Sequence, residues 1–514
     1  MLFNSYEFLL AFLPLTLLGF YLTGLYVSHR AAVAFLVVAS LFFYGWWNPA
    51  YLLLLISSLL FNFAIGRRLA AVGPSRSRAL LVVGVAFNLA AIGYFKYSNF
   101  FVDSINVAFD VSFNLERIIL PLAISFFTFQ QIAFLVDTHQ GKTREVRFLE
   151  YALFVTFFPQ LIAGPIVHHK EMMPQFATRR DFRADWGYLG TGVTIFMLGL
   201  FKKTVIADSM SGYVGLVFRA ADQGEAMPFF GAWAGTLAYS LQIYFDFSGY
   251  SDMAYGLAQM FGIRLPVNFF SPYQSPNIIT FWRTWHMTLS RFLRDYLYVP
   301  LGGNRHGTAR RHVNLMITML LGGLWHGAGG TFVIWGGLHG LYLIVNHGWC
   351  HLTRSWRDTT WLPRWWGTLW GTALTFMCVT VAWVFFRAET LEGSLVMIRA
   401  MSGSEGIRFH PGLLNYFPFL EGIIQLTSPL ERWFGPVESR KAIPEILTVL
   451  TLVFVLPNVY QYMRIAVPQA GRELRRLQWV TFRPSPLHAL FAAVITLWAI
   501  AYVNAQSEFL YFQF

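Results

Sequence analysis

Residues 313–348 read VNLMITMLLGGLWHGAGGTFVIWGGLHGLYLIVNHG, two apolar runs separated by a histidine and a cluster of glycines. The runs at 313–326 and 331–348 are typical of helices that enter or cross a membrane. Because lipid excludes ionisable side chains, His326 at the end of the first run is a functional candidate. The glycines around it bring backbone, or a thin substrate chain, close to the ring. The alternative is a structural histidine bound to a backbone carbonyl where helices pack.

The rest of the chain has the composition of an integral membrane protein. Of its 514 residues, 56% are hydrophobic, 18% aromatic and 12% charged, whereas soluble domains carry roughly 25% charged residues. The mean hydropathy of +0.49 argues against soluble, disordered and collagen-like proteins. Further apolar segments cover 8–27, 31–47, 51–65, 80–95, 118–136, 150–167, 187–201, 228–247, 366–386, 444–460 and 487–503.

These segments predict an all-α polytopic membrane protein. A straight span takes about 20 residues, so the shorter segments should be re-entrant or buried inside the bundle. We expect 11 to 13 helices that cross or enter the bilayer, in a single integral-membrane domain over residues 1–514. Residues 386–443 are expected to form surface helices and loops, and residues 504–514 an aromatic C-terminal tail.

The positive charges are spread over short loops, which predicts the orientation of the chain. Lys and Arg number 38 and acidic residues 26, a net charge of +12. Because no basic block gathers them, we expect no nucleic acid partner. The loop with Arg67, Arg68, Arg76 and Arg78 has no acidic residue and should be cytoplasmic, which places the N-terminus outside. Residues 1–27 lack a basic start and a cleavage pattern, so we expect a retained first span rather than a signal peptide.

Residues 246–312 are the least apolar stretch and hold a second candidate histidine. His286 follows the aromatic sequence FWRTW in a segment that is too polar for lipid. Such a segment lines an interior cavity or lies at the interface as an amphipathic helix, and both alternatives stay open. A neutral imidazole accepts a proton near neutral pH, so His286 and His326 are candidate general bases. Asp246 and Asp252 either orient such a base or pair with buried arginines, and pairing is favoured for Asp252.

Several well-defined catalytic motifs are absent from the sequence. The Gly-Lys-Thr at 141–143 lacks the upstream glycine of a phosphate-binding loop, and neither Gly-x-Ser-x-Gly nor His-Glu-x-x-His occurs. The adjacent His168 and His169 should diverge on a helix, and Cys350 and Cys378 form no spaced cluster. We therefore expect neither a metal site nor a bound cofactor.

Seven segments in combination resemble one protein family. They are Tyr94–Tyr97, Phe158–Pro165, Tyr244–Met253, Phe281–His286, Leu293–Tyr298, Leu301–Arg305 and Leu321–Gly327. The sequence resembles the membrane-bound O-acyltransferases, in the bacterial branch with the alginate O-acetyltransferase membrane subunit and the teichoic acid D-alanyl transfer protein. It is more similar to the alginate type, and the resemblance covers nearly the whole chain. The resemblance implies a ring of helices around a thinned membrane core, with a funnel from each side meeting near a signature histidine.

The resemblance also implies a reaction and partners. His326 corresponds to the signature histidine of the family and His286 to its second, more variable histidine. The implied co-substrate is an acetyl thioester such as acetyl-CoA, and the implied acceptor is an extracytoplasmic polysaccharide. Periplasmic acetyltransferase or carrier proteins and the polysaccharide synthesis machinery are the implied partners, in the bacterial inner membrane. CoA is too large and charged to cross lipid, whereas a two-carbon acyl group can pass through a narrow protein channel.

Other polar residues are candidates for supporting roles. Candidate donor-binding residues are Arg283, Arg291, Arg294, Asn304 and Arg305, and supporting polar candidates are Asp246, Ser248, Asp252 and Trp325. The arginines alternatively pair with Asp295 and lipid headgroups. The C-terminal tail resembles the aromatic motif of a small partner peptide in the D-alanyl branch, which makes Tyr511 a candidate acyl relay. The alternative for the tail is an aromatic interfacial anchor.

Two other functions stay open from the sequence. D-alanyl transfer to teichoic acid differs in the thioester donor that is consumed. A non-enzymatic polysaccharide transporter should show coupling-ion carboxylates or repeat halves, and the apolar segments hold few acidic residues. The sequence does not choose among alginate, cellulose, peptidoglycan and other glycans as the polymer.

Overall fold

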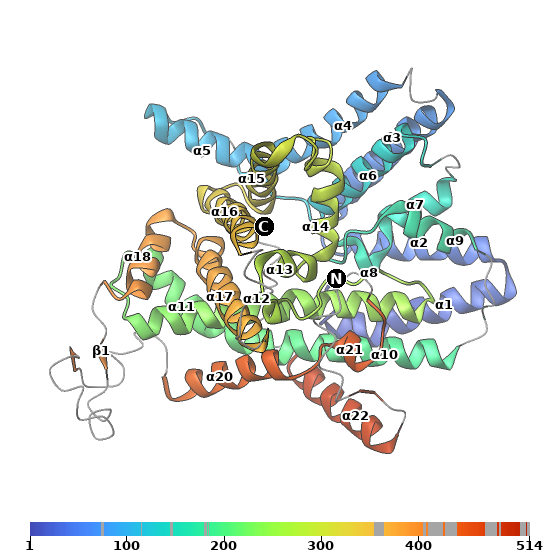
Figure 1. Ribbon diagram of the computed structural model, residues 1–514. Helices are drawn as coiled ribbons and strands as arrows, with labels where there is room; N and C mark the ends of the chain where they lie inside the picture. The colour runs from blue at the N-terminus through green and yellow to red at the C-terminus, as the bar shows by residue number, and fades with distance from the viewer. Residues whose placement is uncertain are drawn as a thin grey trace.

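The computed structural model describes residues 1–72, 77–114, 116–143, 147–178, 182, 185–353, 364–404, 408–409, 425–426, 439–467, 481–482, 485–503 and 510. The described chain is helical except for one pair of two-residue strands (Figure 1). The first part forms η1 (Glu7–Phe12), α1 (Leu13–Tyr26), α2 (His29–Gly45), α3 (Pro49–Val72), α4 (Arg78–Ile92), η2 (Gly93–Tyr97), α5 (Ser98–Phe109), α6 (Ile124–His139), α7 (Phe148–Thr156), α8 (Phe158–Leu161) and α9 (His169–Ala177).

The middle part of the chain supplies the centre of the molecule. It forms α10 (Trp186–Phe201), η3 (Lys202–Ala207), α11 (Asp208–Asp222), α12 (Phe229–Met260), η4 (Pro272–Gln274), α13 (Ile278–Thr284), α14 (Met287–Leu293), η5 (Arg294–Tyr298), α15 (Gly307–His326) and α16 (Gly330–Leu352). The segment η4 is a 3₁₀ turn, whereas η1, η2, η3 and η5 are π-helical. Such π-helical turns within longer helices often accompany functional sites.

The last part forms α17 (Arg364–Arg387), α18 (Leu391–Ser402), β1 (Arg408–Phe409), β2 (Gln425–Leu426), α20 (Ser439–Val455), α21 (Val459–Tyr462) and α22 (Pro486–Ala501). Strands β1 and β2 pair in parallel. Helix α18 packs against α11 and α12. Most of 405–438 lies outside the described residues, so the surface helices and loops expected there stay a prediction.

The all-α polytopic membrane class is confirmed. Within the described part of the chain, five helical stretches are long and apolar enough to cross a membrane: Glu7–Tyr26, Pro49–Val72, Arg78–Phe109, Trp186–Asp222 and Trp366–Arg387. Two shorter apolar helices are His29–Gly45 and Pro486–Ala501. The total of 11 to 13 membrane helices and their arrangement in a ring stay predictions.

Polar residues at the helix starts explain several of the element boundaries. The Ser28 side chain accepts a hydrogen bond from the backbone of α2, Asp185 does so for α10 and Ser485 for α22. Such caps satisfy backbone N–H groups that have no partner within the first helical turn. The apolar sequence that follows each cap then continues as helix.

The long helix α12 is buried along almost its whole length. It carries the supporting polar candidates Asp246, Ser248 and Asp252. It packs against α10 through glycines: a Cβ atom at Gly199 would lie 2.6 Å from the carbonyl oxygen of Gly249, and one at Gly256 would lie 2.5 Å from that of Gly192. Because these contacts are backbone to backbone, the two helices approach closely. Asp246 and Asp252 therefore lie inside protein rather than in lipid.

Helices α15 and α16 form a close pair on either side of the glycine-rich turn after His326. A Cβ atom at Gly323 would lie 2.2 Å from the carbonyl oxygen of Phe332, and one at Gly336 would lie 2.3 Å from that of Met319. Figure 1 shows this pair beside α13 and α14, with α4 and α5 extending away above them. The glycines thus hold the end of α15 against the start of α16.

Candidate active site

His326 lies in the last turn of α15 and lines two cavities. Its side chain is buried, and aromatic rings surround it: the centroids of Trp325, Trp335 and Phe386 lie 4.9, 5.1 and 5.2 Å from that of the imidazole. One cavity is shared with Lys96 and Trp325. The other, narrower cavity is shared with His286. The residue is therefore surrounded by aromatic rings and contributes to the lining of both cavities.

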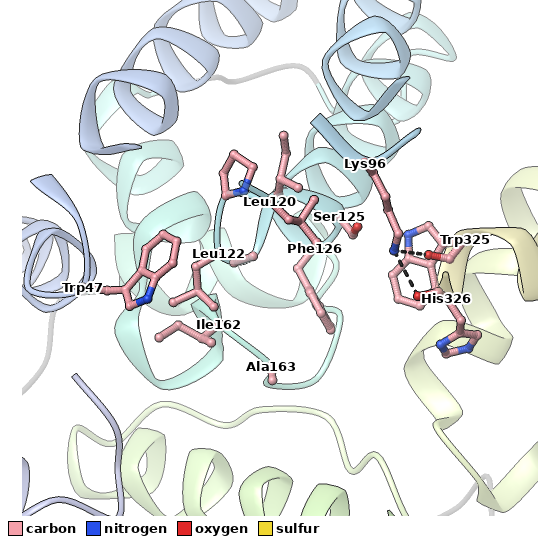
Figure 2. A pocket seen from close by; sticks show the side chains of 13 residues that line it. Trp47, Lys96, Leu120, Leu122, Ser125, Phe126, Ile162, Ala163, Trp325 and His326 are labelled. Carbon is pink, nitrogen blue, oxygen red and sulfur yellow. Dashed lines mark hydrogen bonds between the residues drawn. The ribbon is translucent and has the colours of Figure 1, made fainter. Parts of the chain in front are cut away.

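A lysine and a tyrosine from η2 hold the end of α15. Lys96 Nζ donates hydrogen bonds to the carbonyl oxygens of Trp325 and His326, the second over 3.2 Å, and Tyr97 Oη donates to that of Leu324 over 2.6 Å. Figure 2 shows the Lys96 side chain reaching these two carbonyls from the neighbouring helix. The last carbonyls of a helix lack partners within it and attract donors and cations. The three hydrogen bonds from Lys96 and Tyr97 therefore fix the turn that carries His326.

Trp325, a supporting candidate from the sequence, forms part of the same wall. Its ring stacks on Phe129, with centroids 5.0 Å apart and planes at 18°, and Lys96 Nζ lies 5.6 Å from the Trp325 ring centroid. This side of His326 is thus an aromatic surface with the Lys96 amine against it.

The cavity beside Lys96 opens at one end of the helix bundle. Residues 120–126, before and at the start of α6, line it together with Trp47 (Figure 2). Trp47 precedes α3, whose 24 residues extend about 36 Å to the arginine-rich loop. Ser77 in that loop is hydrogen-bonded to His139 at the far end of α6 over 2.8 Å. The cavity therefore lies at the end opposite to the loop that we predict to be cytoplasmic.

His286 occupies a strained position between α13 and α14. Its φ of +41° is unusual for a residue with a side chain, and such outliers often occur at functional sites. The backbone around it is held by neighbouring residues, because Met287 N–H donates to the Asn268 carbonyl over 2.9 Å. The ring itself is buried, with its centroid 4.8 Å from that of Phe247.

Asn268 sets the tautomer of His286. Asn268 Oδ1 accepts hydrogen bonds from the backbone N–H of Thr288 at 3.3 Å and from its hydroxyl at 2.9 Å, which identifies Oδ1 as the acceptor atom. The same oxygen lies 3.0 Å from His286 Nδ1, so Nδ1 carries the proton. The basic lone pair of the neutral ring is therefore on Nε2, as a general base requires.

The two predicted histidines share the narrower cavity, which also contains Asp246 and Leu510. The other lining residues are apolar or aromatic: Ile243, Phe247, Trp285, Trp335, Trp383 and Phe386. Leu510 belongs to the predicted aromatic tail, is buried, and its backbone is hydrogen-bonded to Asp246. Tyr511, the candidate relay, lies outside the described residues.

The buried aspartates pair with lysines, so the expectation of arginine partners was wrong. Asp252 Oδ2 lies 2.6 Å from Lys202 Nζ, and Asp246 Oδ1 lies 2.6 Å from Lys203 Nζ. Lys203 also contacts Asp208 over 2.8 Å. Both lysines belong to η3, which packs against α12. Ser248, another supporting candidate, is buried on α12, and its Oγ has no hydrogen-bond partner among the described residues.

The candidate donor-binding residues divide into two groups. Arg291 forms two hydrogen bonds with the Glu171 carboxylate, at 2.5 and 3.1 Å, and Arg294 pairs with Asp295 at 2.7 Å. The alternative of pairing with Asp295 thus holds for Arg294. Three others are exposed: Arg283, Asn304 and Arg305.

A polar cluster near the arginine-rich loop differs from what the sequence suggested. His168 is the extended residue before α9 rather than part of it, so its ring lies 4.5 Å from that of His169 instead of diverging. Asp137 Oδ2 accepts from Tyr296 at 3.0 Å and lies 2.9 Å from His168 Nε2. Burial lowers the pKa of His169 to about 3, and the neighbouring cationic groups contribute, so its ring is neutral at pH 7.

This cluster has ligand types that a metal ion uses, but its charge is already balanced. The ligand atoms of Asp137, His168 and His169 all lie within 4.8 Å of one another. The ammonium groups of Lys142 and Lys170 lie 3.1 and 3.6 Å from the Asp137 carboxylate. Because they occupy the carboxylate that would neutralise a cation, the cluster gives no argument for a metal. The absence of a metal site stays a prediction.

Sequence reasoning missed three residues that the structure places at the site. Lys96 lies beside an apolar segment, where a lysine indicates a functional role. Its partners on α15 lie some 230 residues later in the sequence, so the sequence alone did not connect Lys96 with His326. Asn268 and Trp335 carried no signal, because only the folded chain brings them next to His286 and His326.

Comparisons with known proteins agree with the motifs at this site. Residues 142–386 match the model of the membrane-bound O-acyltransferase family. A peptidoglycan O-acetyltransferase of Helicobacter pylori is 44% identical over 79% of this chain and 81% of its own length. A protein of Pseudomonas aeruginosa named "Probable alginate O-acetylase AlgI" is 42% identical over 78% and 75%. A teichoic acid D-alanyltransferase of Bacillus subtilis is 27% identical over 53% and 70%.

Proposed function

Because the chain belongs to the membrane-bound O-acyltransferase family and is therefore an O-acyltransferase, we propose that it transfers acetyl groups from cytoplasmic acetyl-CoA to the outside of the inner membrane. The acetyl groups serve the O-acetylation of an extracytoplasmic polysaccharide. The observation that supports this most directly is the position of His326 between two cavities, one of them shared with His286. A donor and an acceptor can approach one base from different directions in this arrangement.

The chemistry requires a base, and the two histidines are suited to this role. The acceptor hydroxyl gives its proton to an imidazole nitrogen while its oxygen attacks the thioester carbonyl carbon. The carbon–sulfur bond then breaks, and the thiolate of CoA takes the proton back from the imidazolium. We assign the main role to His326 and a second role to His286, whose lone pair on Nε2 suits a base or a hydrogen-bond acceptor.

The donor phosphates need cationic partners on the cytoplasmic side. Arg283 and Arg305 are exposed and are our preferred cationic partners, and the exposed Asn304 amide can add a neutral hydrogen bond. Arg291 already pairs with Glu171 and Arg294 with Asp295. The CoA phosphates would therefore have to displace these carboxylates from the arginines. These solvent-exposed pairs contribute at most about 1 kcal/mol each, which makes such an exchange inexpensive.

The C-terminal tail supplies a candidate acceptor. Leu510, which precedes Tyr511 in the sequence, lines the cavity that holds both histidines. In our proposal the Tyr511 hydroxyl takes the acetyl group and passes it to a periplasmic carrier or acetyltransferase. Tyr511→Phe should abolish polymer acetylation without lowering the amount of protein in the membrane. Unchanged acetylation in that variant would remove the relay from the scheme.

The relatives guide the choice of acceptor. Their names refer to peptidoglycan, alginate and, at lower identity, teichoic acid. We therefore favour acetylation of an exopolysaccharide or cell-wall glycan such as alginate, cellulose or peptidoglycan over D-alanyl transfer. The alternative of a non-enzymatic transporter does not agree with the family membership.

The test uses a deletion strain that is complemented with wild type or His326→Ala, with membrane levels of both proteins measured. Polymer-bound acetate should return with wild type and stay absent with the variant. Purified wild type should also release free CoA thiol slowly from acetyl-CoA, whereas D-alanyl transfer would leave this donor unused. Full acetylation by His326→Ala would contradict the assigned role.

A further inference from the structure

Trp335 is one of two aromatic residues of the narrower cavity, with Phe386, whose rings lie directly against His326. It is 1% exposed, and its ring centroid lies 5.1 Å from that of His326 at an interplanar angle of 85°. It stacks on Trp383, with centroids 5.8 Å apart and planes at 19°, and its edge meets Phe386 at 5.0 Å. These contacts hold the indole in one orientation beside the imidazole.

The close crossing of α15 and α16 fixes this arrangement. Gly336, the residue after Trp335, faces the backbone of α15 so closely that a Cβ atom there would lie 2.3 Å from the Met319 carbonyl oxygen. Gly323 makes the matching approach from α15, three residues before His326. The two side chains are thus carried by backbones that cannot slide apart without losing this contact.

The indole N–H of Trp335 has no hydrogen-bond partner among the described residues, although the nitrogen is buried. Leaving a buried donor unpaired costs about 1–3 kcal/mol, so such a group calls for an explanation. Trp383 lines the same cavity, and its indole N–H donates to the Tyr273 hydroxyl over 3.2 Å. Two stacked tryptophans therefore differ in one respect: the donor of Trp383 is used by the protein, and that of Trp335 is not.

Acyl transfer creates a need for such a donor. When an acceptor oxygen attacks a thioester, the carbonyl electron pair moves onto the carbonyl oxygen, which becomes negatively charged. A preorganised donor in a site without water stabilises that charge, and it need not itself be charged. The cavity has room for about one water-sized group, which suits a carbonyl oxygen better than a solvated anion.

We propose that the Trp335 indole N–H donates a hydrogen bond to the carbonyl oxygen of the acetyl thioester, and binds it more strongly as the tetrahedral intermediate forms. This inference rests on the proposed function. His326 removes the acceptor proton, the oxygen–carbon bond forms, and Trp335 holds the resulting oxyanion. The carbonyl then re-forms, the carbon–sulfur bond breaks, and the CoA thiolate recovers the proton from His326.

The test compares Trp335→Phe with Trp383→Phe as the matched control, using the purified full chain and release of CoA thiol from acetyl-CoA. Loss of an oxyanion donor lowers kcat by about 10²–10³-fold, so Trp335→Phe should show that loss with little change in KM. Trp383→Phe loses the bond to Tyr273 and part of the stack on Trp335, so it controls for lost packing and should lower kcat much less than Trp335→Phe. A carbonyl-free thioether analogue of acetyl-CoA should bind equally to wild type and both variants.

A second replacement separates the N–H from the shape of the ring. Benzothienylalanine at position 335, introduced as an unnatural amino acid, keeps the bicyclic outline and removes the donor, so it should match Trp335→Phe in kcat. Near wild-type kcat in this variant, or equal losses at positions 335 and 383, would overturn the inference while His326→Ala stays inactive. Activity of His326→Ala would instead overturn the proposed function.

Discussion

Replacing Asn268 with leucine should remove the hydrogen bond that fixes the tautomer of His286, while nearly preserving the side-chain volume at position 268. Asn268 is fully buried, and its Oδ1 accepts from His286 Nδ1 and from both the backbone N–H and the hydroxyl of Thr288. The Thr288 hydroxyl can rotate, but its backbone N–H cannot. Leucine thus leaves two donors to be accommodated, the Thr288 N–H and the imidazole N–H.

The magnitude follows from these two donors. Each unsatisfied buried donor costs about 1–3 kcal/mol, so Asn268→Leu should lower the free energy of unfolding by about 2–6 kcal/mol. The imidazole can relieve part of this cost by moving its proton to Nε2, which removes the lone pair that a base needs. In a Ser-His-Asp triad, a wrong tautomer costs about 10⁴-fold in kcat, and this sets an upper limit for the loss here. We expect a loss of at least about 100-fold.

The assay is polymer-bound acetate in complemented cells, together with thermal unfolding of the detergent-solubilised protein. Asn268→Asp is the matched control, because a carboxylate keeps the acceptor for His286 and Thr288 and loses only the donor to Ser251. It should be markedly more active than Asn268→Leu. Equal activity of these two variants, at similar membrane levels, would refute the tautomer argument.

Two further predictions concern the packing that supports the site. Lys203→Met leaves Asp246 buried without its ion-pair partner and should destabilise the protein by about 3–5 kcal/mol; Lys203→Met with Asp246→Asn should recover part of this in thermal unfolding. Gly336→Ala drives a Cβ atom into the backbone of α15 and should cost about 1–3 kcal/mol with loss of acetylation. Gly337→Ala, whose Cβ would lie 3.5 Å from a leucine methyl group, should be close to neutral in both assays.

The sequence predicted the class of fold and the two central histidines for the same physical reason. His326 stood out because lipid disfavours an imidazole in an apolar segment, and His286 stood out because its whole segment is too polar for lipid although apolar segments flank it. The geometry between them was not visible, because Asn268, Trp335 and Leu510 lie outside the segments that carry the two histidines and reach the site only when the chain folds.

Two expectations failed for local reasons. His168 and His169 were expected to diverge on a helix, but α9 begins at His169, and the extended residue before it turns its ring toward its neighbour. Asp252 was expected to pair with a buried arginine, and for Asp246 this was one of two alternatives, whereas the lysines of η3 lie beside both aspartates. A sequence pattern shows that a buried charge needs a partner of opposite charge. It does not show which residue that partner is.

The attachment of η2 to the last turn of α15 connects an apolar helix of the predicted membrane region with the candidate histidine His326. The stretch Arg78–Phe109 is only 17% buried within its apolar window, so the rest of the described chain leaves most of its surface uncovered. Because bilayer thickness influences the tilt of such helices, and Lys96 and Tyr97 bond to the last carbonyls of α15, we expect bilayer thickness to affect the position of His326. We therefore expect rates measured in detergent or in a foreign lipid to differ from those in the native membrane. Lipid chain length should be held constant in any comparison of kinetic constants.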